Sequence, residues 1–112
     1  MMTIDKATRG NAGIVTVDGR MDADASTDFE AACTQLTARG AKHVVADLTA
    51  LTYISSMGLR AFLAVAKARQ EAGGELVLVG LAGFVKQVFD LTRVTSLFRL
   101  CDSVEAALEA LK

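Results

Sequence analysis

Short, almost wholly apolar runs alternate along this chain with segments of helical periodicity, and this alternation constrains the fold more than any other feature. The runs Lys42–Leu48 and Glu75–Leu81 have the composition of strands that are buried on both faces of a sheet. Segments with apolar residues at positions i, i+3, i+4 and i+7 precede, separate and follow these runs. Because parallel strands need crossover connections, the pattern predicts an α/β fold with a largely parallel sheet.

The same patterns place the remaining elements, with glycine as the punctuation because the chain has no proline. A weak strand at Thr3–Lys6 is expected to pair with a strand at Ile14–Val17, which should end in a turn at Gly19. After the Lys42–Leu48 run we expect a loop at Thr49–Ile54. A last strand is expected at Ser96–Leu100, and helices are expected over Ser26–Arg39, Met57–Gly73, Val85–Thr92 and Val104–Leu111.

Capping signals mark several helix ends. Thr27 and Glu30 are spaced as a capping box for the first helix, and Asp102 and Glu105 for the last. Gly40 is expected to close the first helix. The total is about five strands and about four helices, and the periodicity leaves open whether the helices cover one face of the sheet or both.

Length and composition narrow the class of protein. A chain of 112 residues is the size of one domain, residues 1–112, and 52% hydrophobic with 22% charged residues is ordinary for a globular core. The net charge is −1 with no basic stripe, which argues against a nucleic-acid partner. No apolar run approaches the roughly 20 residues of a membrane span, and the first ten residues lack the apolar region of a signal peptide. We expect a soluble, cytoplasmic protein and, because no extra amphipathic face is left over, a monomer.

Motifs of common enzyme classes are absent from the sequence. It has no Walker A loop, no G-x-G-x-x-G and no G-x-S-x-G. The single histidine, His43, enters a strand that leads away from it toward Asp47, so it is poorly placed to act as a base for Ser56. Two distant cysteines, Cys33 and Cys101, do not form a disulfide framework or a metal motif. We therefore expect no enzyme activity, cofactor or metal.

The stretch TYISSMGLRAF places two serines, Ser55 and Ser56, between a predicted strand and a predicted helix. One interpretation is that either serine is only the helix N-cap. The other is that Ser56 is modified, because a phosphate there would lie against the free N–H groups and the positive end of the helix dipole. Sites in open α/β sheets are built at this edge, beyond the carboxyl ends of the strands.

The neighbours of Ser56 allow similar pairs of interpretations. Asp22 and Asp47 both lie near predicted strand ends and would form an acidic rim around Ser56 if they share its edge; otherwise Asp22 is a turn or cap residue and Asp47 binds the backbone of the next loop. Gly58 either lets a partner's backbone approach or lets the helix pack closely on a strand. Met57 is a flexible apolar side chain that suits a binding surface or the edge of the core.

The segment VVADLTALTYISSMGLRAF resembles the signature of STAS domains, specifically of the anti-sigma factor antagonists. The resemblance continues through GGELVLVGLAGFVKQVFDLTRVTSLFRL and back to GRMD, and covers nearly the whole chain. It implies the STAS fold, a mixed sheet of about five strands with about four helices chiefly on one side. It also implies partner switching: the unphosphorylated protein binds an anti-sigma factor that is a serine kinase, frees the sigma factor, and is released when phosphorylated. A serine phosphatase then resets it.

The resemblance also implies roles for individual residues. The phosphoacceptor, two positions before Gly58, is Ser56, and the aspartates of the family pattern fall on Asp22 and Asp47. The sequence departs from the pattern at three positions. Ser55 replaces an aspartate, Met57 replaces the second serine, and Gly83 replaces a proline at the start of the third helix. The partner-binding surface implied by the family is formed by Asp22, Asp47, Ser55, Ser56, Met57 and Gly58.

Two other functions remain open at this stage. One is a STAS subunit that does not switch, within a sensory or lipid-transport complex; Ser56→Ala and Ser56→Asp would then behave alike. The other is a small-molecule or nucleotide binder, or a hydrolase, that uses the edge formed by Ser56, Asp22 and Asp47. No glycine loop for phosphate supports the latter.

Overall fold

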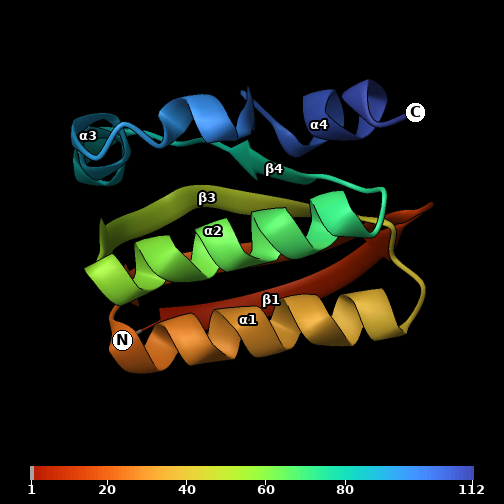
Figure 1. Ribbon diagram of the computed structural model, residues 1–112, viewed down its shortest axis with the longest axis horizontal. Coiled ribbons are helices and arrows are strands. Elements are labelled where there is room, and N and C mark those ends of the chain that lie inside the picture. Colours follow the sequence, from red (N-terminus) through yellow and green to blue (C-terminus); the bar gives the residue numbers. More distant parts are fainter. Residues whose placement is uncertain (1) are drawn as a thin grey trace.

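A computed structural model describes residues 2–112 and has one mixed sheet as its centre (Figure 1). The strands lie in the order β1-β2-β3-β4-β5; β1 is antiparallel to β2, and the other neighbours are parallel. Their bounds are β1 Met2–Arg9, β2 Ala12–Met21, β3 His43–Ile54, β4 Leu76–Val79 and β5 Arg99–Cys101. The helices are α1 Ala23–Ala38, α2 Ser56–Glu71, α3 Gly83–Leu91 and α4 Val104–Ala110, with a short 3-10 helix, η1, at Thr95–Leu97. The predicted α/β fold, element order and opening strand pair are confirmed.

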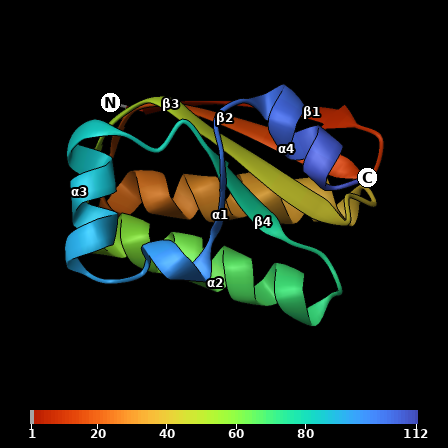
Figure 2. The same cartoon turned by 90° about the horizontal axis from the view of Figure 1, so that it is seen from above.

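The helices are divided unequally between the two faces of the sheet (Figure 2). Three phenylalanines, Phe29 of α1, Phe62 of α2 and Phe89 of α3, are fully buried on one face, with ring centroids 4.6 Å and 5.8 Å apart along the series. On the other face, Ala107 and Leu111 at the α4 end of the chain pack on a smaller cluster of strand residues. The question left open by periodicity is thereby settled: both faces are covered, but chiefly one.

Strands β2 and β3 run further than the sequence predicts. A turn was expected at Gly19 and a loop at Thr49–Ile54, yet both stretches continue the parallel ladder, with Gly19 opposite Leu51 and Met21 opposite Ile54. Two register shifts interrupt this pairing. Because each bulge breaks the alternation of side chains between the faces, the extension has no strand-like pattern in the sequence.

The start of α1 also differs from the expectation. Thr27 and Glu30 do not form its capping box, because the helix begins a turn earlier, at Ala23. Asp22 is the N-cap, and its Oδ1 accepts a hydrogen bond of 2.9 Å from the Ala25 N–H. Because the longer β2 passes directly into α1, the last residue with an extended backbone before the helix is Asp22, and this residue is therefore the N-cap. Gly40 follows the helix with a φ of +100°, as predicted.

The C-terminal elements are shifted in the same way. The expected strand at Ser96–Leu100 is divided between η1 and the short β5. Ser103, and not the pair Asp102 and Glu105, caps α4, with its Oγ accepting from the Ala106 N–H at 3.0 Å. As in α1, the N-cap is the residue immediately before the first helical turn.

Candidate functional site

The ends of β2 and β3 bring two predicted site segments together. Met21 lies opposite Ile54, and the Ser55 N–H donates a 2.9 Å hydrogen bond to the Met21 carbonyl. Helix α1 starts directly after β2 and helix α2 directly after β3, so Asp22 and Ser56 lie at one edge of the sheet. This edge is at the left of Figure 1, where both helices begin.

The two serines of this edge have different structural roles. Ser55 is the N-cap of α2, with extended backbone and with its Oγ accepting a 3.1 Å hydrogen bond from the Gly58 N–H. Ser56 is the first helical residue; its side chain is exposed, and its hydroxyl makes no hydrogen bond within residues 2–112. The capping interpretation therefore applies to Ser55, and the Ser56 hydroxyl is not needed to form the helix.

Gly58 serves internal packing rather than an open surface. It is buried, and a Cβ atom at this position would lie 2.8 Å from Cγ1 of Ile54 and 3.0 Å from Cγ of Met21. Both are buried side chains at the ends of β3 and β2. The glycine thus allows the first turn of α2 to approach the two strands closely. Met57, by contrast, is 45% exposed next to Ser56.

The expected acidic rim is only partly assembled. Asp22 is exposed at this edge while its carboxylate caps α1. Asp47 is seven residues before the end of β3 at Ile54, which is roughly 20 Å along a strand. The longer β3 therefore separates Asp47 from Ser56, and the idea that both aspartates surround Ser56 is wrong in its geometry.

Asp47 instead organises the chain before helix α3. Its Oδ1 accepts hydrogen bonds from the Thr49 N–H at 3.1 Å and from the Thr49 hydroxyl at 2.6 Å. Gly80, which has a φ of +72° just after β4, packs so tightly against Thr49 that a side chain would clash there. The hydrogen bond from the Thr49 N–H confirms the alternative interpretation, in which Asp47 binds the backbone that follows it.

A partly exposed stack of three side chains lies beside the predicted site and was missed by the sequence analysis. The rings of Tyr53 and Phe84 are parallel within 5°, with centroids 5.9 Å apart. The guanidinium of Arg20 lies 4.2 Å from the centroid of the Tyr53 ring. These residues come from the ends of β2 and β3 and the start of α3. The only available signal was that Tyr53, the single tyrosine of the chain, lies two residues before Ser55.

His43 is not placed to activate Ser56. It begins β3, whereas Ser56 follows the end of that twelve-residue strand, so the expectation of a poor Ser56–His43 pair is confirmed. His43 is buried, and its Nδ1 accepts a hydrogen bond of 3.1 Å from the Glu75 N–H. Burial, followed by the charge of Lys42, lowers the pKa of this imidazole. Within residues 2–112, no group of three or more His, Cys, Asp or Glu side chains could hold a metal ion.

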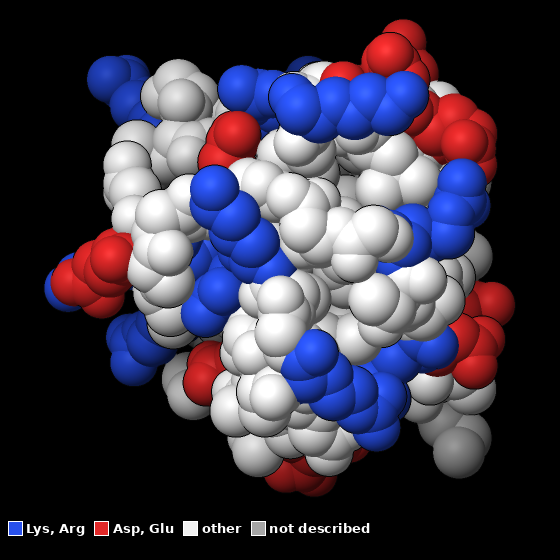
Figure 3. All heavy atoms as spheres, turned by 90° about the vertical axis from the view of Figure 1, so that its right-hand side faces the viewer, with Lys and Arg blue, Asp and Glu red and all other residues white. Residues whose placement is uncertain are grey.

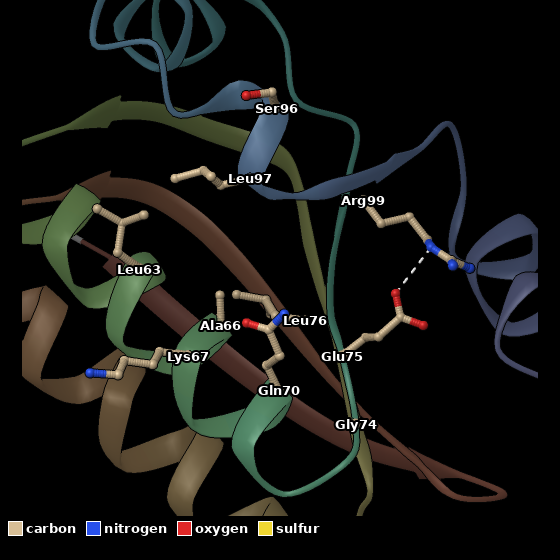
Figure 4. Close-up of a pocket in the computed structure, with 10 residues that line it drawn as sticks. All are labelled: Leu63, Ala66, Lys67, Gln70, Gly74, Glu75, Leu76, Ser96, Leu97 and Arg99. Carbon is tan, nitrogen blue, oxygen red and sulfur yellow. Dashed lines mark ion pairs between the residues drawn. The ribbon is translucent and has the colours of Figure 1, made fainter.

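A groove of about 460 Å³ lies away from Ser56, between α2 and η1 (Figure 4). Its walls begin at Leu63, seven residues along α2 from Ser56, and the ion pair between Glu75 and Arg99, at 3.1 Å, closes one side. Lys67 points away from the other lining residues in Figure 4. The lining consists of Leu63, Ala66, Lys67, Gln70, Gly74, Glu75, Leu76, Ser96, Leu97 and Arg99.

The opposite end of the molecule presents a mixed surface. Figure 3, which views the right-hand end of Figure 1, shows Lys and Arg side chains separated by uncharged residues, with Asp and Glu around them. None of the helices in residues 2–112 has the length and apolar character needed to cross a bilayer.

Comparisons with known proteins agree with this architecture. The family model described as "STAS domain" matches residues 3–107. The protein named "Putative anti-sigma factor antagonist BtrV", from Bordetella bronchiseptica, is 38% identical over 99 residues, covering 88% of this chain and 85% of that protein. An anti-sigma factor antagonist from Mycobacterium paratuberculosis has a similar crystal structure, with a TM-score of 0.86 at 22% identity and coverage of 99% and 94% of the two chains.

The antagonist SpoIIAA has the same fold in two states. Its unphosphorylated form gives a TM-score of 0.83 at 15% identity, with coverage of 96% of this chain and 95% of that one. The phosphorylated form, from Bacillus, gives 0.73 at 16% identity and full coverage of both chains. The match of the family model and the identity to the Bordetella protein show that this chain belongs to the STAS domain family of anti-sigma factor antagonists.

Proposed function

We propose that this protein is a partner switch controlled by phosphorylation of Ser56. In its unphosphorylated form it binds an anti-sigma factor that is also a serine kinase, and thereby releases a sigma factor or another output. Phosphorylation of Ser56 ends this binding, and a serine phosphatase restores the binding form. The observation that carries the proposal is that Ser55 caps α2 while the Ser56 hydroxyl is exposed and free.

In this role the protein is a substrate rather than an enzyme. The Ser56 Oγ attacks the γ-phosphorus of ATP held by the kinase, a Ser–O–P bond forms, and ADP leaves. The hydroxyl proton goes to a base of the kinase, because His43 is at the far end of β3. We propose that the protein acts in the cytoplasm, because ATP-dependent kinases act in that compartment and because free cysteines such as Cys33 and Cys101 are typical of it. We also propose that it is a monomer between binding events.

The new phosphate would change the surface without unfolding the domain. It carries about −1.5 to −2 charges at neutral pH, and the first turn of a helix tolerates negative charge. The charge is added next to exposed Met57, at the edge of the sheet that also holds Asp22. A partner surface that accommodates a neutral hydroxyl beside an apolar side chain would then have to bury an unpaired dianion, which is strongly unfavourable.

The proposed partner surface is smaller than the sequence suggests. Asp22, Ser55, Ser56 and Met57 form its outer part, since they lie together at the ends of β2 and β3. Gly58 supports it from within by seating the start of α2. Asp47 lies outside it and fixes the chain at Thr49, next to the turn before α3.

The test is affinity capture of partners from a lysate of the source organism, with wild-type, Ser56→Ala and Ser56→Asp proteins as baits. The captured kinase is then incubated with each protein and ATP. Wild-type and Ser56→Ala should capture the same ATP-binding regulator, Ser56→Asp should not, and only wild-type should gain a phosphate by mass spectrometry. Ser103→Asp is the matched control, because it adds the same charge at the N-cap of α4, outside the proposed surface, where aspartate is also a good N-cap. It should retain the partner. Equal capture by all variants would favour a STAS subunit that does not switch.

A further inference from the structure

The stacked patch formed by Arg20, Tyr53 and Phe84 has the features of a binding surface. Phe84 is 51% exposed, and Arg20 is exposed as well. Tyr53 interacts with both of them: the centroid of its ring is 4.2 Å from the guanidinium carbon of Arg20 and 5.9 Å from the Phe84 centroid. An exposed apolar ring held rigidly in a stack loses little conformational freedom when a partner binds.

The fold leaves this patch uncovered. Tyr53 alternates with Ile54, which faces the core below α1 and α2, so Tyr53 faces the other side of the sheet. On that side α4 packs over Ala12, Ile14 and Val45, at the opposite ends of β2 and β3. The carboxyl end of this face is therefore left to the stacked patch.

Arg20 gives the patch a definite chemical preference. Its guanidinium stacks on Tyr53, yet it makes no ion pair or hydrogen bond with the rest of residues 2–112. Such an arginine has a fixed orientation and free N–H donors that match the two oxygens of a carboxylate. The complementary surface carries an Asp or Glu for Arg20 and an apolar side chain for Phe84.

The patch is continuous with the proposed switch surface. Arg20 lies two residues before Asp22 on β2, and Tyr53 lies two residues before Ser55 on β3. The two residues are also paired in the sheet register. A partner that covers Ser56 and Met57 at the start of α2 would therefore border the patch.

We infer that the stacked patch is a second docking point for the same anti-sigma factor kinase, which binds it through a carboxylate beside an apolar side chain. This inference rests on the proposed function and deepens it. The patch adds affinity and partner selection to a switch that Ser56 operates. Tyr and Arg side chains are over-represented among the residues that dominate protein interfaces.

The test uses the full chain and the kinase captured with the Ser56→Ala protein, with affinity measured by calorimetry. Phe84→Ala and Arg20→Ala should each weaken binding about tenfold or more. Arg20→Lys should weaken it nearly as much as Arg20→Ala, because lysine keeps the charge but loses the stack and the paired donors. Leu91→Ala is the matched control: Leu91 is another exposed apolar residue of α3, at its other end, and the change should leave affinity intact.

Salt dependence tests the carboxylate directly. The affinity of wild-type protein should fall with salt more steeply than that of Arg20→Ala, since a partly exposed ion pair is screened. Unchanged affinity in both Phe84→Ala and Arg20→Ala, with Ser56 still phosphorylated by the kinase, would overturn the inference and leave the proposed function standing. Failure of the wild-type protein to gain a phosphate or to capture a kinase would remove both. Thermal unfolding of each variant should match wild type, because these side chains are exposed.

Discussion

Replacing Ser55 and Ser56 separately by alanine should give two different effects on stability. The Ser55 Oγ accepts a 3.1 Å hydrogen bond from the Gly58 N–H, and Gly58 is buried. Ser55→Ala therefore leaves a backbone donor that water reaches poorly, which places the loss in the upper half of the usual range for an N-cap, at about 1.5 kcal/mol. The exposed Ser56 hydroxyl makes no bond within the described chain, so Ser56→Ala should change the free energy of unfolding by less than about 0.5 kcal/mol.

Thermal unfolding followed by circular dichroism measures this difference. For a chain of 112 residues, 1.5 kcal/mol corresponds to a fall in Tm of about 6 °C, whereas Ser56→Ala should unfold within about 2 °C of wild type. Ser55→Asp is the control that retains a capping oxygen, and it should keep the wild-type stability. If Ser56→Ala is destabilised as much as Ser55→Ala, the division of roles between the two serines is incorrect, and the argument that Ser56 is free for modification fails with it.

Three further predictions concern the interior. Gly58→Ala should lower the free energy of unfolding by about 1–2 kcal/mol in urea titrations, because a Cβ atom 2.8 Å from Ile54 forces repacking at a cost greater than the gain in helix propensity; a stabilised variant would contradict this. The lowered pKa of His43 means that the unfolded chain binds a proton before the folded chain does as pH falls below 6.5, so wild-type stability should decline there and level off below the folded pKa. In His43→Gln, which keeps an acceptor for the Glu75 N–H, that part of the pH dependence should disappear; an unchanged profile from pH 7 to 5.5 would refute it. Phe62→Ala should cost about 3–5 kcal/mol by urea unfolding, because the ring is fully buried between its neighbours in the core; a loss below about 1 kcal/mol would mean that the site collapses.

The candidate site could be predicted in part, because some of its geometry is local. That a serine caps α2, and that a second one is exposed beside it, follows from a strand, a Ser-Ser pair and a helical stripe in succession. Which serine caps depends on the exact residue at which the helix begins, and this is set by the docking of Gly58 on Met21 and Ile54. Sequence patterns place helix ends only to within a few residues.

The placement of the aspartates shows where local reasoning fails. Asp22 was expected at the site edge and lies there, because the chain passes directly from β2 into α1. Asp47 was expected there too, but β3 continues past it to Ile54 by pairing with β2. That pairing joins residues more than thirty positions apart and contains bulges, so no short window of sequence records it.

The sequence by itself determined the order of the elements and the residues that face the core. Apolar side chains at helical spacing and continuous apolar runs report directly on burial, because the periods of the helix and the strand fix which side chains share a face. The stripe Phe29, Ala32, Cys33 and Leu36 is buried as its spacing predicts. Gly40 likewise ends α1, since a left-handed backbone at that point favours glycine whatever the tertiary context.

Only the tertiary structure decided which surfaces remain open and which residues meet on them. The face covered by α4, the length of β3 and the stack of Arg20, Tyr53 and Phe84 all depend on contacts between elements distant in the chain. Such contacts are chosen by packing and by sheet register, and these are properties of the whole fold rather than of any local pattern. The exposed Ser56 and the stack next to its edge are therefore visible as one surface only once the chain has folded.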